Sequence, residues 1–171
     1  MSAVDLIVRR LGRPDADELG AFFVSNDQPD VRRTFNPFAL TRATALSLLE
    51  EGRKDRFYGG FVGEAWAAFA MLRGWDEGFD VPSLGVLVDR RWRGRGLGGR
   101  ITDLAIAEAR TLGCRRVRLS VFASNQVALR IYVRRGFVEV SREPVEVLGE
   151  GDQRIVMAAS LDSPVPPERE A

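Results

Sequence analysis

The chain contains no histidine and only one cysteine among its 171 residues. Without histidine, Ser-His-Asp and Cys-His catalysis are excluded and the commonest metal ligand is missing, so we expect no metal site. The single cysteine, Cys114, excludes an intrachain disulfide and fits a reducing, cytoplasmic environment. Any catalysis must therefore rest on other groups.

Long apolar runs and an excess of one charge are also missing. No stretch approaches the roughly 18 apolar residues of a membrane-spanning helix, and residues 1–10 lack the apolar core of a signal peptide. The 25 Lys and Arg residues against 24 Asp and Glu give a net charge of +1. Such a balance argues against wholesale binding of nucleic acid or anionic membrane. We expect a soluble, intracellular protein.

The apolar periodicity predicts one α/β (α+β) domain at residues 1–161, followed by a disordered tail at 162–171. A strand, a helix and a strand across 84–121 form a βαβ unit, so those two strands should be parallel. Hairpins before and after this unit predict a mixed sheet with helices on both faces. Strands are expected at 6–10, 56–62, 65–72, 84–88, 117–121, 137–148 and 154–159, helices at 15–26, 41–52, 101–112 and 125–135, and a turn at 149–152.

The most informative segment is RRWRGRGLGGR at 90–100, between an apolar strand and a helix. Its glycines let the backbone turn sharply and approach a ligand, and N–H groups at a helix start favour negative charge. Five arginines suit phosphate oxygens. The segment is neither a dinucleotide fingerprint nor a Walker motif. It predicts a pyrophosphate site; the alternatives are a solvated turn or an RGG-like patch for nucleic acid.

Two motifs follow one another along the chain. The first consists of Arg93, Gly96 and Gly98, and the second of Asn125, Ala128, Tyr132 and Gly136-Phe137. Together they resemble the signature of the GNAT superfamily of acyl-CoA-dependent N-acyltransferases, which is Arg or Gln, two residues, Gly, one residue, then Gly or Ala, followed later by an Asn, a helical Tyr and a closing Gly-Phe. The resemblance implies a central mixed sheet of about seven strands flanked by helices, and acetyl-CoA as the cosubstrate.

The resemblance also implies a role for each part of the site. The backbone at 86–88 would pair with the pantetheine arm, and the amides at 93–99 would cradle the pyrophosphate. Asn125 would hydrogen-bond the pantetheine, and Tyr132 would protonate the departing thiolate; the alternative for Tyr132 is a purely structural, half-buried tyrosine. The implied cofactor-binding residues are Val86, Leu87, Val88, Arg93, Gly94, Arg95, Gly96, Gly98, Gly99, Asn125, Ala128 and Tyr132.

The general base and the acceptor site are left open by the two motifs. Some family members carry a glutamate on the strand before the glycine-rich turn, but Pro82 stands near that position here. The acidic loop at 74–80 offers carboxylates that could accept a proton or attract a cationic amine, and Glu77 is our candidate base. The alternative is an ordinary solvated loop. The predicted substrate-binding residues are Phe35, Phe38, Trp75, Asp76 and Asp80, since aromatic faces beside carboxylates suit a sugar ring that bears an amine.

These features predict an N-acetyltransferase that moves an acetyl group from acetyl-CoA to a primary amine of a small molecule, with an amino sugar as one candidate. Amine attack on the thioester needs no covalent enzyme intermediate, so Cys114 is expected to have a packing role. The alternatives are a non-catalytic acyl-CoA-binding regulatory module, an enzyme for protein or peptide amines, and a nucleic-acid-binding domain that uses residues 90–100. The oligomeric state stays open between a monomer and a homodimer.

Overall fold

The structure, a computed structural model, describes residues 4–162 and contains one seven-stranded sheet in the order β1-β2-β3-β4-β5-β7-β6. The strands are β1 (Ile7–Arg10), β2 (Arg56–Val62), β3 (Ala65–Arg73), β4 (Ser83–Val88), β5 (Arg116–Phe122), β6 (Val138–Val147) and β7 (Glu150–Ser160). Only β4 and β5 pair in parallel. The predicted mixed sheet and its parallel pair are confirmed, whereas the predicted tail lies, apart from Asp162, outside the described residues.

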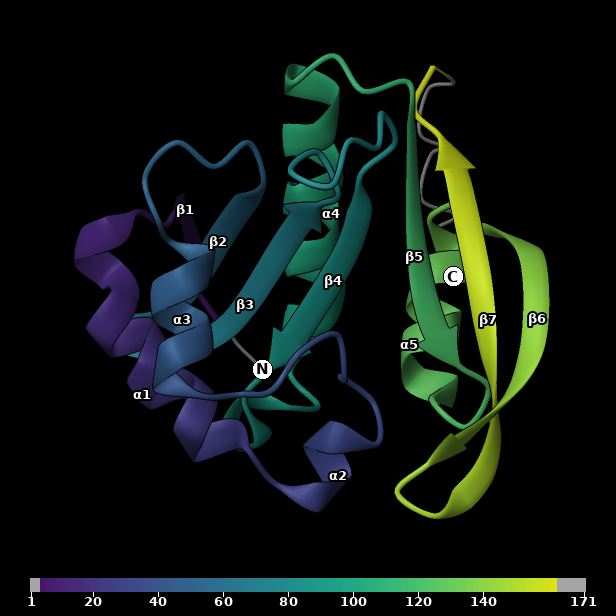
Figure 1. Ribbon diagram of the computed structural model, residues 1–171, viewed down its shortest axis with the longest axis horizontal. Coiled ribbons are helices and arrows are strands. Elements are labelled where there is room, and N and C mark those ends of the chain that lie inside the picture. The colour runs from purple at the N-terminus through teal and green to yellow at the C-terminus, as the bar shows by residue number, and fades with distance from the viewer. Residues whose placement is uncertain (1–3, 163–171) are drawn as a thin grey trace.

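Helices cover both faces of the first four strands (Figure 1). They are α1 (Ala16–Asn26), α2 (Pro29–Arg32), α3 (Arg42–Leu48), α4 (Leu97–Thr111) and α5 (Gln126–Arg134), with 3-10 turns η1 (Arg13–Asp15) and η2 (Arg90–Trp92). Side chains alternate along a strand, so Phe69 and Met71 of β3 pack in the core with α1 and α3. Ala68 and Ala70 pack in the second core with α4.

The strands β5, β7 and β6 are covered on one face only. Val117, Leu119 and Val121 of β5 are buried in the core with α4 and α5. The alternating residues Arg116 and Arg118 are exposed on the opposite face, and Figure 1 shows no helix in front of these strands. The sheet therefore has an open face beside the α1–α3 layer.

Three local predictions need correction. The short helix α2 was not expected, and α3 ends at Leu48 instead of continuing to residue 52. The last hairpin turns at Leu148 and Gly149, with φ of 52° and 80°, and β7 already begins at Glu150. Positive φ at both central positions is typical of a two-residue hairpin turn, which twists as the strands do. Within the described range, no helix has the length and apolar character needed to cross a membrane.

Candidate active site

The parallel strands β4 and β5 separate almost as soon as they begin. Their only paired residues are Ser83 and Arg118, and the Arg118 N–H donates to the Pro82 carbonyl at 3.0 Å. Beyond this point the two strands diverge toward their C-terminal ends (Figure 1). The second half of β4 therefore has no strand partner on the β5 side.

The free edge of β4 presents backbone groups that no strand engages, although the Val88 carbonyl accepts a hydrogen bond from the Arg93 Nε–H at 3.4 Å. The Asp89 N–H donates to the Ala67 carbonyl at 2.9 Å, toward β3. Because successive residues of a strand direct their N–H and C=O groups to opposite sides, those of Val86 and Val88 point toward β5. An extended, amide-bearing ligand is able to pair with this edge as an added strand would.

The glycine-rich loop ends in the N-terminus of α4, a helix of 15 residues. Gly94 and Gly96 have φ of 72° and 76°, a left-handed conformation that favours glycine. Arg100 is the first residue of α4 whose N–H reaches a helix-type acceptor, the Gly96 carbonyl at 3.3 Å. Among the described residues, the N–H groups of 94–99 meet no protein acceptor. They form a cluster of free donors at the positive end of a helix dipole, which suits a pyrophosphate.

The arginine side chains of this loop are largely engaged by the protein itself. Asp30 of α2 pairs with Arg93 at 3.0 Å and with Arg90 at 3.5 Å. The Arg95 guanidinium lies 4.9 Å from the centre of the Trp92 ring. The sequence suggested that these arginines would face phosphate oxygens. In this arrangement the backbone amides are the free donors of the loop, and α2 is docked on it through Asp30.

A buried carboxylate holds the start of the loop. Asp89, only 3% exposed, accepts hydrogen bonds from the backbone and side chain of Arg91 and from the Asn26 amide at 3.1 Å. Asn26, at the end of α1, is 1% exposed. Desolvation acts to raise the pKa of Asp89, but the hydrogen bonds from Arg91 and Asn26 outweigh it and lower the pKa below 3.8. The network ties α1 to the first turn of the phosphate loop.

We expect Asp89→Asn to lower the free energy of unfolding at pH 7 by about 1.5–3 kcal/mol, the usual contribution of hydrogen bonds to a charged group. The folded pKa lies below the unfolded value of 3.8, so the stabilisation is present above about pH 4 and is lost as the pH falls through the folded pKa. Urea unfolding of both proteins from pH 7 to pH 2.5 measures this. A difference that stays constant down to pH 2.5 would contradict it.

The helix α5 supplies the second predicted motif. The Asn125 Oδ1 accepts a hydrogen bond from the Ala128 N–H at 3.2 Å and so caps the helix. This leaves the Asn125 side-chain amide N–H groups as donors. A Cβ added to Gly98 would lie 3.3 Å from Ile131 of α5 and 3.8 Å from Val88 of β4. The start of α4, the middle of α5 and the end of β4 therefore meet at one place.

Tyr132 presents a free hydroxyl from inside the core. The residue is 8% exposed, and its ring centre lies 5.7 Å from that of Phe137. Its hydroxyl meets no protein partner within residues 4–162. Since that range contains no fully buried side-chain oxygen or nitrogen without a partner, the hydroxyl must reach the surface of an opening. Burial raises the pKa of Tyr132 to about 12, so the hydroxyl stays protonated at neutral pH.

Comparison with known proteins identifies the family. The family model described as "Acetyltransferase (GNAT) family" matches residues 20–137. The chain belongs to the GNAT acetyltransferase family. It is therefore an acyl-CoA-dependent N-acetyltransferase, as its two motifs predicted. Among curated proteins none matches the chain in sequence.

Solved GNAT structures share the fold at low sequence identity. A putative phosphinothricin N-acetyltransferase has a TM-score of 0.76 and 19% identity, covering 92% of this chain and 99% of its own. A putative acetyltransferase from Salmonella typhimurium, solved with its cofactor acetyl-CoA, has a TM-score of 0.76 and 18% identity over 97% and 99%. A spermidine N-acetyltransferase chimera from Vibrio cholerae and hSSAT has a TM-score of 0.76 and 16% identity over 92% and 96%.

The acidic loop of this GNAT chain lies at the opposite end of β4 from the phosphate loop (Figure 1). Asp76 accepts hydrogen bonds from the Lys54 and Asp55 N–H groups, at 2.8 and 3.3 Å, and so fastens the loop to the start of β2. Glu77, whose side chain is 53% exposed, pairs with Arg73 at 3.0 Å. The hydrogen bonds give Asp76 a structural role, and Glu77 stands in a surface ion pair.

The aromatic residues predicted to line one acceptor site are divided between the two faces of the sheet. Phe35 is buried beside Phe38 in the core with α1 and α3. Phe38 is half-buried, and the Arg73 guanidinium lies 5.7 Å from its ring centre. Trp75 packs against the other core and, with Asp80, lines a cavity of about 520 Å³ near the end of α4. On the α1 side the structure brings together Phe35 and Phe38 and links Phe38 to Glu77 through Arg73, and on the α4 side it brings together Trp75 and Asp80.

Sequence reasoning missed several residues that shape the site. The buried pair of Asn26 and Asp89, the ion pairs of Asp30 and the position of Arg118 at the separation of β4 and β5 were not singled out. Pro82 is buried, and its carbonyl holds β5. The polar residues that alternate along 116–120 were a signal for an uncovered face. Among the described residues no group of three potential metal ligands lies close together.

Proposed function

We propose that this chain transfers the acetyl group of acetyl-CoA directly to a primary amine of a small molecule. One observation carries the proposal: β4 has no strand partner on the β5 side at its C-terminal half and ends beside the unbonded amides at the start of α4, where α5, the helix that carries Tyr132 and its free hydroxyl, also packs. These three features suit the amide-bearing arm, the pyrophosphate and the sulfur of acetyl-CoA, respectively. The fit supports binding across the separation of the two strands.

Bound acetyl-CoA supplies an activated acyl thioester. In our proposal the Val86 N–H orients the thioester carbonyl and stabilises charge on its oxygen as the amine attacks. Tyr132 holds its proton at Oη and directs it at the sulfur. With a pKa of about 12, Tyr132 is a weaker acid than a thiol. It therefore acts mainly as a hydrogen-bond donor, and its hydrogen bond to the sulfur strengthens as charge builds up there. The proton that the attacking amine loses accounts for the proton that the product thiol gains.

The amine must be neutral to attack. The buried carboxylate at the end of β4, Asp89, is already engaged by Arg91 and Asn26. Glu77 is exposed and paired with Arg73. We propose that the amine loses its proton to water, so that the rate rises with pH until the amine is neutral. In our proposal Glu77 is not the general base. It has a supporting role, through its ion pair with Arg73.

We expect Glu77→Gln to leave kcat within about twofold of the wild type and to preserve the ionisation in the pH–rate profile, because only a transition-state role would lower kcat. Initial rates of thiol release at saturating amine, from pH 6 to pH 10, measure both quantities. Asp80→Gln serves as the control for removal of a charge from the same loop. A kcat lowered a hundredfold, with the ionisation removed, would restore Glu77 as the base.

The proposed activity is tested by thiol release from acetyl-CoA with a panel of primary amines, alongside calorimetric titration of acetyl-CoA. Acetyl-CoA binding together with amine-dependent thiol release supports the enzyme. Tight binding with no turnover of any amine would support a non-catalytic acyl-CoA-binding module instead. The amino-sugar interpretation loses its main support, because Trp75 and Phe35 lie on opposite sides of the sheet.

A further inference from the structure

Two arginines flank a serine on the same face of the sheet. Arg73 of β3 is paired with Ser83 of β4, and Ser83 is paired with Arg118 of β5. Neighbouring strands lie about 4.8 Å apart, so the Cα atoms of the two arginines are roughly 10 Å apart. Met71, two residues before Arg73, packs on the α1 side of the sheet. Arg118 alternates with buried residues of the other core, so both arginines face the α1 side.

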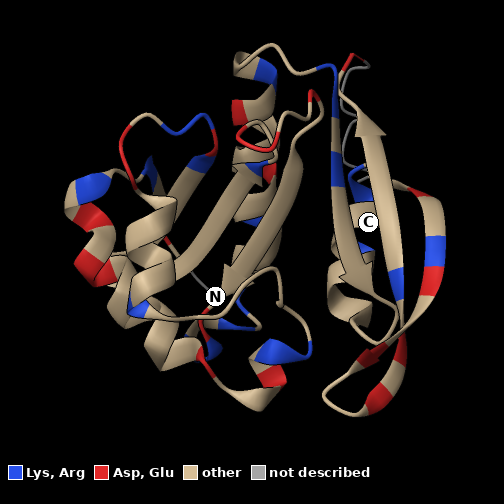
Figure 2. Ribbon diagram, in the orientation of Figure 1, with Lys and Arg blue, Asp and Glu red and all other residues tan. Residues whose placement is uncertain are grey.

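Arg118 and its neighbour Arg116 are not neutralised by the rest of the described chain. The ion pairs of this region join Arg115 to Asp162 and Arg154 to Glu143, and none involves Arg116 or Arg118 within residues 4–162. Figure 2 shows basic residues and no acidic ones along β5. Glu77 of the neighbouring acidic loop is already paired with Arg73. Among the ion pairs of residues 4–162, Arg118 thus has no acidic partner where β4 and β5 separate.

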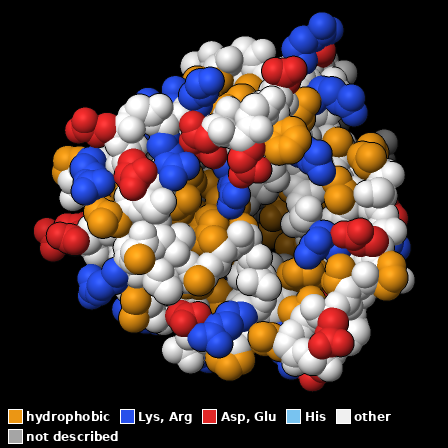
Figure 3. All heavy atoms as spheres, viewed as in Figure 1, with side chains coloured by type: hydrophobic (Ala, Val, Ile, Leu, Met, Phe, Trp, Pro, Cys, Tyr) orange, Lys and Arg blue, Asp and Glu red, His pale blue; other side chains and the backbone are white. Residues whose placement is uncertain are grey.

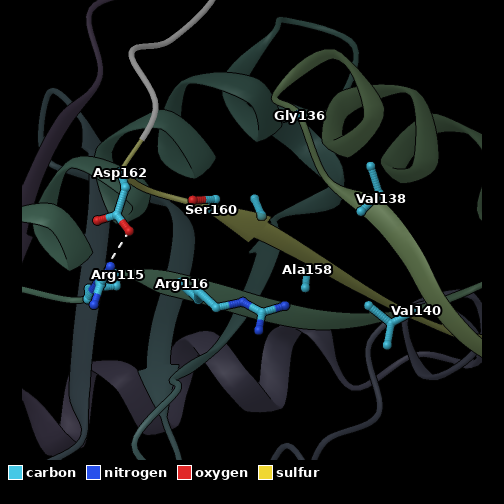
Figure 4. A pocket seen from close by; sticks show the side chains of 9 residues that line it. Arg115, Arg116, Gly136, Val138, Val140, Ala158, Ser160 and Asp162 are labelled. Atoms are coloured by element: carbon cyan, nitrogen blue, oxygen red, sulfur yellow. Dashed lines mark hydrogen bonds and ion pairs between the residues drawn. The ribbon is translucent and has the colours of Figure 1, made fainter.

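The surface beside Arg116 is recessed. Figure 3 shows a hollow between the α1–α3 layer and the β5–β7 part, with apolar side chains on its floor and both basic and acidic ones at its border. Arg116 also lines a cavity of about 560 Å³ with Val138, Val140 and Ala158. Figure 4 shows Arg116 extended over the sheet beside Ala158, while Arg115 turns toward Asp162. A small molecule is able to lie here with one end against an arginine.

We propose that the acceptor amine also carries an anionic group, a carboxylate or a phosphate, and that Arg118 binds this group. The inference rests on the proposed function and names the chemistry of its acceptor. Val86 lies three residues beyond Ser83, on the order of 10 Å along β4. An arginine side chain bridges most of that distance and binds carboxylate or phosphate oxygens with two parallel hydrogen bonds. An amino acid or an amino phosphate therefore fits between the two points.

The same charges act against a polycationic acceptor. A second ammonium group near Arg118 would be repelled at short range, since two positive charges a few Å apart repel each other near a protein surface. Asp76, which the sequence offered as an attractive group for cations, is held by backbone N–H groups on the loop. Glu77 is partly neutralised by Arg73. Charge complementarity thus selects the anionic amine.

The test compares acids with their uncharged counterparts. Glycine, β-alanine and 4-aminobutyrate are assayed against their carboxamides, and 2-aminoethyl phosphate against ethanolamine, by thiol release from acetyl-CoA. We expect kcat/KM to be at least tenfold higher for the acids of one series than for their uncharged counterparts. The series that shows this preference tells whether the site binds a carboxylate or a phosphate. Arg118→Gln should raise the KM of the preferred acid at least tenfold and change the KM of its uncharged partner by less than about twofold.

Arg110→Gln is the matched control, because Arg110 lies at the far end of α4 and its replacement removes the same charge. It should leave both KM values unchanged. Turnover of amines without preference for acids, or an equal effect of Arg118→Gln on acids and amides, would overturn the inference while leaving the acetyltransferase proposal intact.

If none of these amines is turned over, acetate and inorganic phosphate are titrated into the CoA-bound protein and followed through the arginine Nε–H NMR signals, with that of Arg118 assigned from the Arg118→Gln spectrum. A saturable shift of this signal supports the anion site, and its absence for both anions overturns it. Failure of acetyl-CoA itself to bind in calorimetry would instead overturn the proposed function.

Discussion

Tyr132→Phe is expected to lower kcat by about 10²–10³-fold, the loss typical when one hydrogen-bond donor to developing charge is removed. The hydroxyl acts as charge develops on the leaving sulfur, so its loss should be felt in the chemical step. Affinity for acetyl-CoA should remain nearly intact, because the ring that fills the space beside Phe137 is kept. Thiol release at saturating substrates and calorimetry with acetyl-CoA measure the two effects separately.

The chain offers a matched control in Tyr58, the other of its two tyrosines. Tyr58 is also buried, and its pKa is likewise raised to about 12, by burial and by the nearby Glu108. Its hydroxyl donates to Glu108 at 3.3 Å, away from the separation of β4 and β5. Tyr58→Phe should leave kcat unchanged and lower the free energy of unfolding by about 1 kcal/mol. If both variants retain wild-type turnover when chemistry is rate-limiting, Tyr132 has no catalytic role.

The pKa of Tyr132 also limits the pH dependence of the reaction. The hydroxyl remains protonated well above pH 10, because its pKa is raised to about 12. An acid that is needed in its protonated form causes a loss of rate only as the pH rises through its pKa. The wild-type profile should therefore rise with ionisation of the amine and show no decline due to Tyr132 below pH 10.

Helices and strands with a regular apolar periodicity and with turn residues at their ends were predictable from the sequence. The alternation of 117–121 with polar residues defined β5 to within one residue at each end, and Gly63 and Gly113 marked a hairpin and a helix end. The helix α2 has four residues and a single buried side chain, Val31, so no apolar period could reveal it. Boundaries of short elements depend on tertiary contacts, here the docking of Asp30 on the phosphate loop.

The donor side of the site was more predictable than the acceptor side. The phosphate loop depends on backbone geometry, which its glycines and the helix start provide and which the local sequence determines. The acceptor side depends on the face of the sheet toward which each loop side chain turns. Trp75 and Glu77 are two residues apart, yet one packs against the α4 side and the other pairs with Arg73 on the α1 side. No periodicity in a turn could have separated them.

Arg118 illustrates a signal that was present but incomplete. Its alternation with buried residues marked it as facing away from one core, as any solvated strand residue does. What distinguishes it is the pairing of Ser83 with Arg73 on one side and with Arg118 on the other. That row joins residues 73, 83 and 118, and the absence of a helix over it follows only from the arrangement of the whole sheet (Figure 1).

Gly96→Val is expected to weaken acetyl-CoA binding at least tenfold, or about 1.4 kcal/mol. Gly96 is left-handed, with φ of 76°, and precedes the free amides of α4. A Cβ built on it meets no protein atom within 4 Å, so the new side chain would project into the space before those amides. Gly98 is a poorer choice, because its Cβ would press on Ile131 at 3.3 Å and disturb the packing of α4 on α5.

Gly113→Val separates backbone strain from loss of the phosphate site. Gly113 follows the other end of α4, with φ of 79° and equally open surroundings. A side chain in the left-handed region costs about 1–2 kcal/mol at either position, so both variants should lose similar stability in urea. Only Gly96→Val should lose affinity for acetyl-CoA in calorimetry. Equal affinities for the two variants would mean that the amides at the start of α4 do not hold the pyrophosphate.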